Sequence, residues 1–320
     1  MHFQEEIQSF YTYLQSQQTA QNYLLQCYKQ IDKIDAERKS YENCNVFMYC
    51  LHHGREYYRA GEKLDTVLKP VMYFYGMAHL LKACLLTKRP EYPESTSVLA
   101  HGVSTRKRKK KDYSFLEDEV KVQHKGLFPY FSEHLFGINK VPFEKVTMKS
   151  LFQLIPELIT FFTYEQEHSL VKIGHLDDLT ITVPKTICDD YHMTENALIK
   201  RLESYLPKVL VKEENSKSIM LKLSEPITSD VGPFQINLNS EVYLPTNRDF
   251  FIPISEVMVH YLLLYNLSML SRYEAEWWGE LLATKPDADY PFISRFLDIT
   301  QEKIPMMMGK YLYKKMEGQS

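Results

Sequence analysis

The residues of this sequence that are best suited to chemistry are clustered cations and isolated histidines. The densest charge is a run of six consecutive basic residues, in a chain of 320 residues whose formal net charge is −3. The run consists of Arg106, Lys107, Arg108, Lys109, Lys110 and Lys111. Because the molecule as a whole is slightly acidic, any attraction to nucleic acid must come from such a patch. The run therefore predicts salt-dependent binding to the phosphates of RNA or of a nucleotide.

Two other interpretations of the basic run stay open. Like charges repel one another and resist packing, so the run can also be a solvated surface loop that has no partner. Acidic residues at 117–119 follow closely and offset part of its charge, and only Tyr113 and Phe115 follow it as rings that could stack on bases. The third interpretation is a nuclear-import address.

Three side chains are candidates for catalysis. His79 lies in an apolar helical stretch, as a hydrogen-bonded core residue or as a general acid or base that titrates near neutral pH. His101 precedes Gly102 in "AHGVS", and it either bonds a carbonyl in a structural turn or serves as a second acid or base. Arg272 either forms an ion pair with Glu276, four residues further on, or presents its guanidinium to an anion.

Two tyrosines near these candidates, Tyr75 and Tyr273, are predicted binding residues. A tyrosine combines a large apolar ring with a hydroxyl group that can form a hydrogen bond. Convergence of His101 and Arg272 on one cleft would favour an enzyme, because acid–base partners must lie within hydrogen-bond reach of the same group.

The familiar signatures of cofactor and metal sites are absent from the sequence. It contains no G-x-G pair, no P-loop, no G-x-S-x-G, no H-E-x-x-H and no C-x-x-C. Cys44, Cys50, His52 and His53 lie close together in "CNVFMYCLHH", but on a helix they point in different directions. We therefore expect no metal and no cofactor.

Five cysteines, an odd number, indicate reduced thiols and a cytoplasmic protein. The N-terminus shows no secretory signal, and the apolar stretches are interrupted and shorter than the roughly 18–20 residues that a membrane span needs. We therefore expect no membrane segment.

The pattern of the chain predicts a mainly α fold with a small α+β insertion. Residues 1–165 are expected to form a helical region, 166–252 the insertion, and 253–320 helices that pack back on the helical body. The segment "LDTVLKPVMYFYGMAHLLKACLLTKRP" is apolar all round, which is typical of a helix enclosed by its neighbours. Gly76 and Ala83 would let one neighbour approach this helix closely.

The insertion is expected to contain five short strands and one helix. The strands are "LTITVP", "KVLVK", "SIMLKLS", "FQINLN" and "EVYLP", which are rich in β-branched residues and separated by polar turns. The helix is "TENALIKRLESYL", for which Thr194 is the expected N-cap.

Residues 40–137 resemble the HEPN superfamily of helical domains. The resemblance rests on "VMYFYGMAHLLKACLLTKR", "AHGVS" and "HKGLFPYFSEHL". It implies an HEPN-like helical body that commonly forms a homodimer. HEPN ribonucleases carry an arginine followed four to six residues later by a histidine, and none of the arginines here has a histidine at that offset. The resemblance therefore implies a non-catalytic HEPN-like fold.

Over its full length the chain resembles the YaaC family of cytoplasmic proteins from Bacillus-type bacteria, which brings no established activity. The residues that carry the resemblance are "KPVMYFYGMAHLLKACLL", "AHGVS", "GLFPYF" and "LSMLSRYEAEWW". Together these observations favour a non-enzymatic binding protein that contacts RNA or nucleotide phosphates through the basic loop. The alternatives are a nuclease or nucleotide-modifying enzyme with an atypical site at His101 and Arg272, or an adaptor whose α+β insertion docks another protein.

Overall fold

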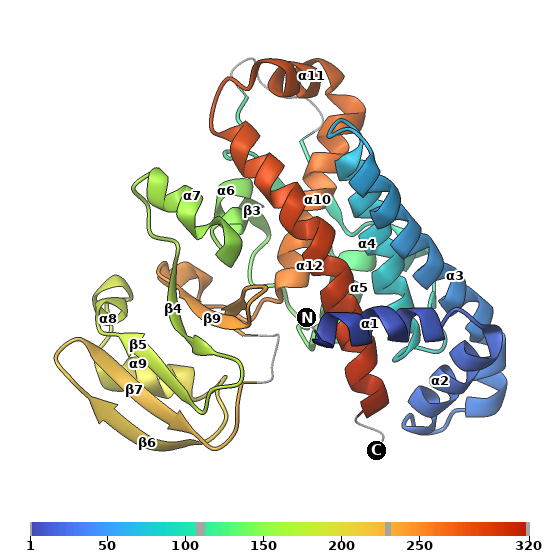
Figure 1. Cartoon of the computed structure of the whole chain (residues 1–320), viewed down its shortest axis with the longest axis horizontal. Coiled ribbons are helices and arrows are strands. Elements are labelled where there is room, and N and C mark those ends of the chain that lie inside the picture. The colour runs from blue at the N-terminus through green and yellow to red at the C-terminus, as the bar shows by residue number, and fades with distance from the viewer. Residues whose placement is uncertain (1, 107–112, 228–231, 318–320) are drawn as a thin grey trace. The chain divides into compact units, whose positions relative to one another are not determined.

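The computed structural model of the chain describes residues 2–106, 113–227 and 232–317 (Figure 1). It separates into two compact units, Met1–Val146 with His260–Ser320 as unit 1, and Thr147–Val259 as unit 2. Twelve α-helices and three small sheets occur in these described ranges, so the expected mainly α fold is confirmed. In the same ranges, no helix combines the length and the apolar character needed to cross a membrane.

The unit boundaries lie after Val146 and after Val259, whereas the sequence predicts boundaries after residues 165 and 252. The segment 260–320 joins the N-terminal region in unit 1, and the short helices between 148 and 164 belong to unit 2.

Unit 1 is built from long helices. They are α1 (His2–Tyr13), α2 (Gln17–Lys29), α3 (Ala36–Lys63), α4 (Lys69–Leu86), α5 (Leu127–Phe136), most of α10 (Glu256–Tyr273), α11 (Ala275–Thr284) and α12 (Asp289–Glu317). The 3₁₀ turn η1 (Thr96–Leu99) follows α4. A small sheet with the order β1-β2-β3 is formed by β1 (Val103–Thr105), β2 (Glu119–Val122) and β3 (Lys145–Thr147), which lies at the unit boundary.

Helix α4 is the centre of unit 1, as its apolar circumference predicts. Pro70 lies in its first turn, where a missing N–H costs least, and two thirds of its residues are buried. Figure 1 shows α3 and α4 side by side. Their close approach depends on glycines, because a Cβ on Gly54 would lie 2.7 Å from Leu80 and one on Gly76 would lie 2.8 Å from the Tyr58 ring. The predicted role of Gly76 is therefore confirmed.

The described C-terminal region contains three helices, α10, α11 and α12. The pattern of "PISEVMVHYLLLYNLSMLSRYEAEWWGELL" predicts one long helix, but the structure has two there, because α10 ends at Tyr273 and α11 starts at Ala275 after an irregular Glu274. Helix α12 is continuous across Pro305.

Unit 2 contains two three-stranded antiparallel sheets. One has the order β4-β9-β8 and the other β5-β7-β6. The strands are β4 (Leu170–His175), β5 (Thr180–Pro184), β6 (Val209–Glu214), β7 (Ser218–Leu223), β8 (Gln235–Ile236) and β9 (Glu241–Pro245). All five predicted strands are present, and β4 is an additional one.

Short helices complete unit 2. They are α6 (Met148–Phe152), η2 (Pro156–Leu158), α7 (Ile159–Tyr164), α8 (Thr186–Asp190), α9 (Glu195–Leu202) and η3 (Arg248–Phe250). The predicted cap of α9 is confirmed, since the Thr194 hydroxyl accepts a hydrogen bond from the Ala197 N–H. Ile181, Leu198 and Leu221 belong to the buried core of this unit.

The glycine contact between α3 and α4 gives a testable prediction. Gly76→Ala should lower the free energy of unfolding of unit 1 by about 1–3 kcal/mol, because the added methyl group overlaps the buried Tyr58 ring. Gly279→Ala on α11 is the matched control, since nothing lies within 4 Å of its added Cβ. The control should raise the free energy of unfolding by up to about 1 kcal/mol through helix propensity.

Urea denaturation followed by tryptophan fluorescence measures both effects, because Trp277 and Trp278 both lie in unit 1. An equal gain in stability for the two variants would show that α3 and α4 do not pack as closely as described.

Candidate functional site

One face of α4 carries three polar side chains that the core does not enclose. Tyr75, His79 and Lys82 are spaced by four and three residues, which places them on the same side of the helix, and all three are half-buried. Helix α3 faces them with His53 and Tyr57. The Tyr57 ring stacks on His79 at 5.7 Å between centroids, and the His53 ring meets the His79 edge at 5.4 Å.

The backbone at His101 is fixed by a contact between two glycines. Gly102 has a φ of +78° and Gly126 a φ of +127°, and a Cβ on Gly126 would overlap the Gly102 backbone. The His101 carbonyl accepts hydrogen bonds from the Phe128 N–H at 3.1 Å and from the Tyr261 hydroxyl at 3.0 Å. The expected special backbone at "AHGVS" is therefore confirmed.

The His101 ring packs among aromatic rings from two helices. Its centroid lies 5.0 Å from Phe74 and 6.2 Å from Tyr75 on α4, and 5.7 Å from Tyr265 on α10. The ring is half-buried. In the turn, the backbone carbonyl of His101 forms the hydrogen bonds. The imidazole lies among the rings of Phe74, Tyr75 and Tyr265.

Arg272, in the last turn of α10, is held in place by neutral groups. Its Nε donates to the Ser268 carbonyl at 2.8 Å, and its Nη1 donates to the Tyr75 hydroxyl at 3.3 Å. The guanidinium carbon lies 5.8 Å from the Tyr75 ring centroid and 5.1 Å from that of Tyr273. The Tyr273 side chain is 67% exposed.

The expected ion pair between Arg272 and Glu276 does not form. The four-residue spacing brings two side chains together only within one helix, and here α10 ends at Tyr273 before α11 begins. Within the described ranges Arg272 makes no ion pair with a carboxylate.

The histidines of this region are driven toward their neutral forms. Burial lowers the pKa of His79 to about 4, with further contributions from Lys82 and His53. Burial also lowers the pKa of His101, helped by Arg272 and Lys82. The Nδ1 of His79 is buried and has no hydrogen-bond partner in the described part of the chain. Two imidazoles that are driven toward their neutral forms therefore lie beside the side chains of Lys82 and Arg272.

We call this group the cationic aromatic cluster. Its members are Tyr57, Tyr75, His79, Lys82, His101, Arg272 and Tyr273. Guanidinium and ammonium groups suit phosphate oxygens, and aromatic rings suit nucleobases. The structure thus brings together all three candidate catalytic residues and both candidate binding tyrosines, which come from positions almost 200 residues apart.

Only the first residue of the basic run, Arg106, lies in the described ranges, and it is exposed. Lys107, Arg108, Lys109, Lys110 and Lys111 lie outside them. Both flanks of the run begin near the cluster. Arg106 follows His101 by five residues, so the two lie at most about 18 Å apart. On the other flank, the Tyr113 ring packs edge-on against Trp277 at 4.9 Å, five residues after Arg272.

Two members of the cluster were missed by the sequence analysis. Lys82 could have been found, because it follows Tyr75 by seven residues and so lies on the same face of α4. Tyr57 carries no such signal, since only the packing of α3 against α4 brings it to His79. Near the other sequence candidates, Cys44, Cys50, His52 and His53, the described residues hold no group of three metal-ligating side chains.

Comparison with known proteins identifies the family of the chain. The profile of the YaaC-like Protein family matches residues 12–312, so the chain belongs to this family. No curated protein and no solved structure gives a significant match.

The lowered pKa of His79 predicts a specific pH dependence of stability. Its folded pKa of about 4 lies below the ordinary value of 6.5, so the folded state binds fewer protons than the unfolded state in that window. The contribution of the neutral ring is complete above pH 6.5 and is lost as the pH falls toward 4. We therefore expect His79→Gln to lose less unfolding free energy than the wild type between about pH 7 and about pH 5.

Urea midpoints from tryptophan fluorescence at the two pH values measure this difference. His52→Gln, on the exposed side of α3, is the matched control and should keep the wild-type pH dependence. If His79→Gln behaves as the control does, the ring of His79 is not held neutral by the fold.

Proposed function

We propose that this YaaC-like protein binds RNA or a nucleotide at the cationic aromatic cluster, with the phosphate on Arg272 and Lys82 and a base against the exposed Tyr273 ring. The observation that carries the proposal is the state of Arg272. It is half-buried and fixed in position, and it has no carboxylate partner in the described ranges. A cation that is pre-positioned without a counter-ion is what anion binding requires.

The aromatic surroundings support a ligand that carries a base. The basic run lacks interleaved aromatic residues that could stack on bases. The cluster contains such rings, and Tyr273 is largely exposed beside Arg272. Stacking on an aromatic ring contributes about 1–3 kcal/mol per base and tolerates any base.

We assign the basic run from Arg106 to Lys111 a supporting role in this proposal. Before the run, Arg106 follows His101 by five residues, and after it the Tyr113 ring contacts Trp277. A run of six cations attracts a polyanion at long range, and this attraction weakens steeply with salt. The cluster then supplies the short-range contacts.

In the same proposal, the helices of unit 1 form an HEPN-like core, and the protein binds its ligand without catalysing a reaction. The HEPN-like core rests on the tyrosine-rich α4 beside α3, and it implies a homodimer. Tyr41, Val46 and Tyr49 on α3 are more than half exposed and offer apolar surface to a second copy. In the described part of the chain none of the five cysteines forms a disulfide, which supports a cytoplasmic location.

Binding of fluorescent RNA oligonucleotides, measured by anisotropy across a salt series, tests the function. Arg272→Gln should weaken binding by about tenfold or more, the loss expected for a charged hydrogen bond. It should also reduce the slope of log K against log salt by about 0.7, the value for one phosphate contact on a single strand. Replacing residues 106–111 by glutamine should reduce the slope further.

Arg38→Gln is the matched control for the loss of one positive charge. Arg38 lies at the start of α3, beside Asp35 and Glu42, and its variant should bind within about twofold of the wild type. Equal losses for Arg38→Gln and Arg272→Gln would reduce the effect to net charge and contradict the assigned site.

Tyr75→Phe tests the positioning of Arg272 separately. It removes the hydroxyl that accepts from Nη1 but keeps the ring, so binding should weaken by about two- to tenfold. An unchanged affinity in the same anisotropy assay would show that this hydrogen bond does not hold Arg272 for the ligand.

A second candidate function is RNA cleavage or another reaction on a nucleotide. It is favoured by the shared neighbour of His101 and Arg272, since both lie about 6 Å from the Tyr75 ring. A neutral imidazole can take a proton while the guanidinium stabilises developing charge. Incubating the same oligonucleotides with the wild type and His101→Ala separates the two functions, because binding alone leaves the RNA intact.

An adaptor role has weaker support, from unit 2. Leu179, Leu210, Val211 and Met220 are exposed on and around the β5-β7-β6 sheet. Such a patch is typical of a surface that meets a protein partner.

A further inference from the structure

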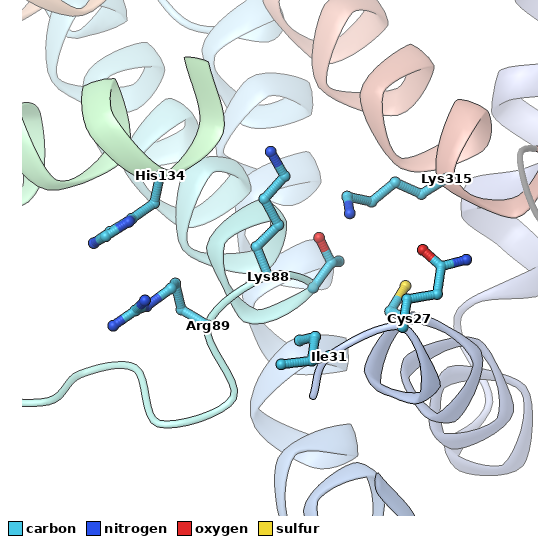
Figure 2. A pocket seen from close by; sticks show the side chains of 8 residues that line it. Cys27, Ile31, Lys88, Arg89, His134 and Lys315 are labelled. Carbon is cyan, nitrogen blue, oxygen red and sulfur yellow. The ribbon is translucent and has the colours of Figure 1, made fainter. Parts of the chain in front are cut away.

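A second group of cations surrounds a small cavity at the C-terminal ends of four helices in unit 1 (Figure 2). The cavity has a volume of about 320 Å³. Cys27 comes from α2, Lys88 and Arg89 follow α4, His134 lies in the last turn of α5 and Lys315 in the last turn of α12. None of the described residues that line the cavity carries a carboxylate.

Two of these cations face one another without a counter-ion. Figure 2 shows the side chain of Lys315 extending toward that of Lys88. Their Nζ atoms lie 5.9 Å and 6.0 Å from the centroid of the same ring, Tyr311. Within the described ranges neither ammonium pairs with a carboxylate, whereas Lys39 and Lys149 pair with glutamates. Partial burial and the charge of Lys315 lower the pKa of Lys88, as expected for two neighbouring cations.

The other two basic side chains of the lining are Arg89 and His134. Arg89 forms an ion pair with Glu94 and also donates to the Tyr130 hydroxyl. Burial and Arg89 lower the pKa of His134, so this imidazole is driven toward its neutral form. The uncompensated positive charge of the cavity therefore belongs to Lys88 and Lys315.

Helix dipoles account for part of this arrangement. A cation near a helix C-terminus offsets the partial negative charge of that end, which explains one lysine each for α4 and α12. It does not explain why the two side chains converge on one ring and repel one another, since each could satisfy its helix end from solvent. Among the described residues, the Lys88 ammonium contacts one backbone carbonyl, that of Leu135, and this contact is long at 3.5 Å.

We propose that this cavity binds a small phosphate dianion between Lys88 and Lys315, either inorganic phosphate or the phosphate of a phosphomonoester. Two ammonium groups match the charge of the dianion. A volume of about 320 Å³ is at the lower end for ligand cavities, so it fits a small molecule and not a polymer. Ile31 contributes an apolar side chain to the cavity wall beside the two lysines. The site shares no residue with the cationic aromatic cluster.

Isothermal titration of the full chain with inorganic phosphate, and then with glycerol 3-phosphate, tests the site at constant ionic strength. We expect saturable binding with one phosphate per chain. Lys88→Gln and Lys315→Gln should each weaken it at least about tenfold, as expected for loss of a charged hydrogen bond. Lys88→Arg and Lys315→Arg keep the charge and should retain most of the affinity.

Two controls separate this site from other effects. Lys314→Gln removes one charge from the same turn of α12 without lining the cavity, and should bind phosphate within about twofold of the wild type. Arg272→Gln should leave phosphate binding unchanged, because it belongs to the other cluster. The proposed RNA binding can therefore fail while this site stands, and the reverse also holds.

The proposal is overturned if millimolar phosphate and glycerol 3-phosphate both give no saturable heat. It is also overturned if both glutamine variants bind as the wild type does, or if Arg272→Gln abolishes the signal. If Lys88→Gln and Lys315→Gln merely lowered stability and left phosphate affinity unchanged, the lysines would serve the helix ends alone. Tighter binding of glycerol 3-phosphate identifies a phosphomonoester as the ligand, and equal or weaker binding identifies free phosphate.

Discussion

The close packing of α3 against α4 is the constraint on which unit 1 depends. Gly54 and Gly61 on α3 and Gly76 on α4 leave no room for a Cβ, so the rings of Tyr58 and Tyr73 lie where side chains would otherwise separate the helices. This contact buries most of α4. The same approach brings Tyr57 onto His79. The glycine contacts therefore determine which side of α4 is covered by α3 and which side is left uncovered.

That open face carries charge which the fold does not neutralise. Buried polar groups are normally hydrogen-bonded, and leaving one without a partner costs about 1–3 kcal/mol. Yet His79 Nδ1 has no partner in the described ranges, and Arg272 is held there by a carbonyl, a hydroxyl and a sulfur. Local exceptions of this kind are expected at functional sites, where a ligand supplies the missing interaction. The unpaired polar groups of the cluster therefore support anion binding more directly than any sequence motif does.

Sequence reasoning succeeded where the signal is local. A few neighbouring residues predict the apolar circumference of α4, the role of Gly76, the Thr194 cap and five of the six strands of unit 2. It failed for β1, which is only three residues long and has no alternating pattern. It also joined α10 to α11, because the break at Glu274 carries neither proline nor glycine. The predicted ion pair between Arg272 and Glu276 requires one continuous helix, so it was wrong for the same reason.

The candidate sites themselves could not be predicted as sites, because each is assembled from distant segments. His101 reaches Tyr75 only because Gly102 and Gly126 meet and Tyr261 bonds the His101 carbonyl. Lys88 and Lys315 meet only because α4 and α12 end at the same place. In both cases the cations lie at the edge of the buried helices and not in the core. A charge without a carboxylate partner is tolerated there because it is only partly removed from water. The chemistry of single residues can be predicted along the chain, but the combinations of charges that we propose to bind phosphate form only after the helices have packed.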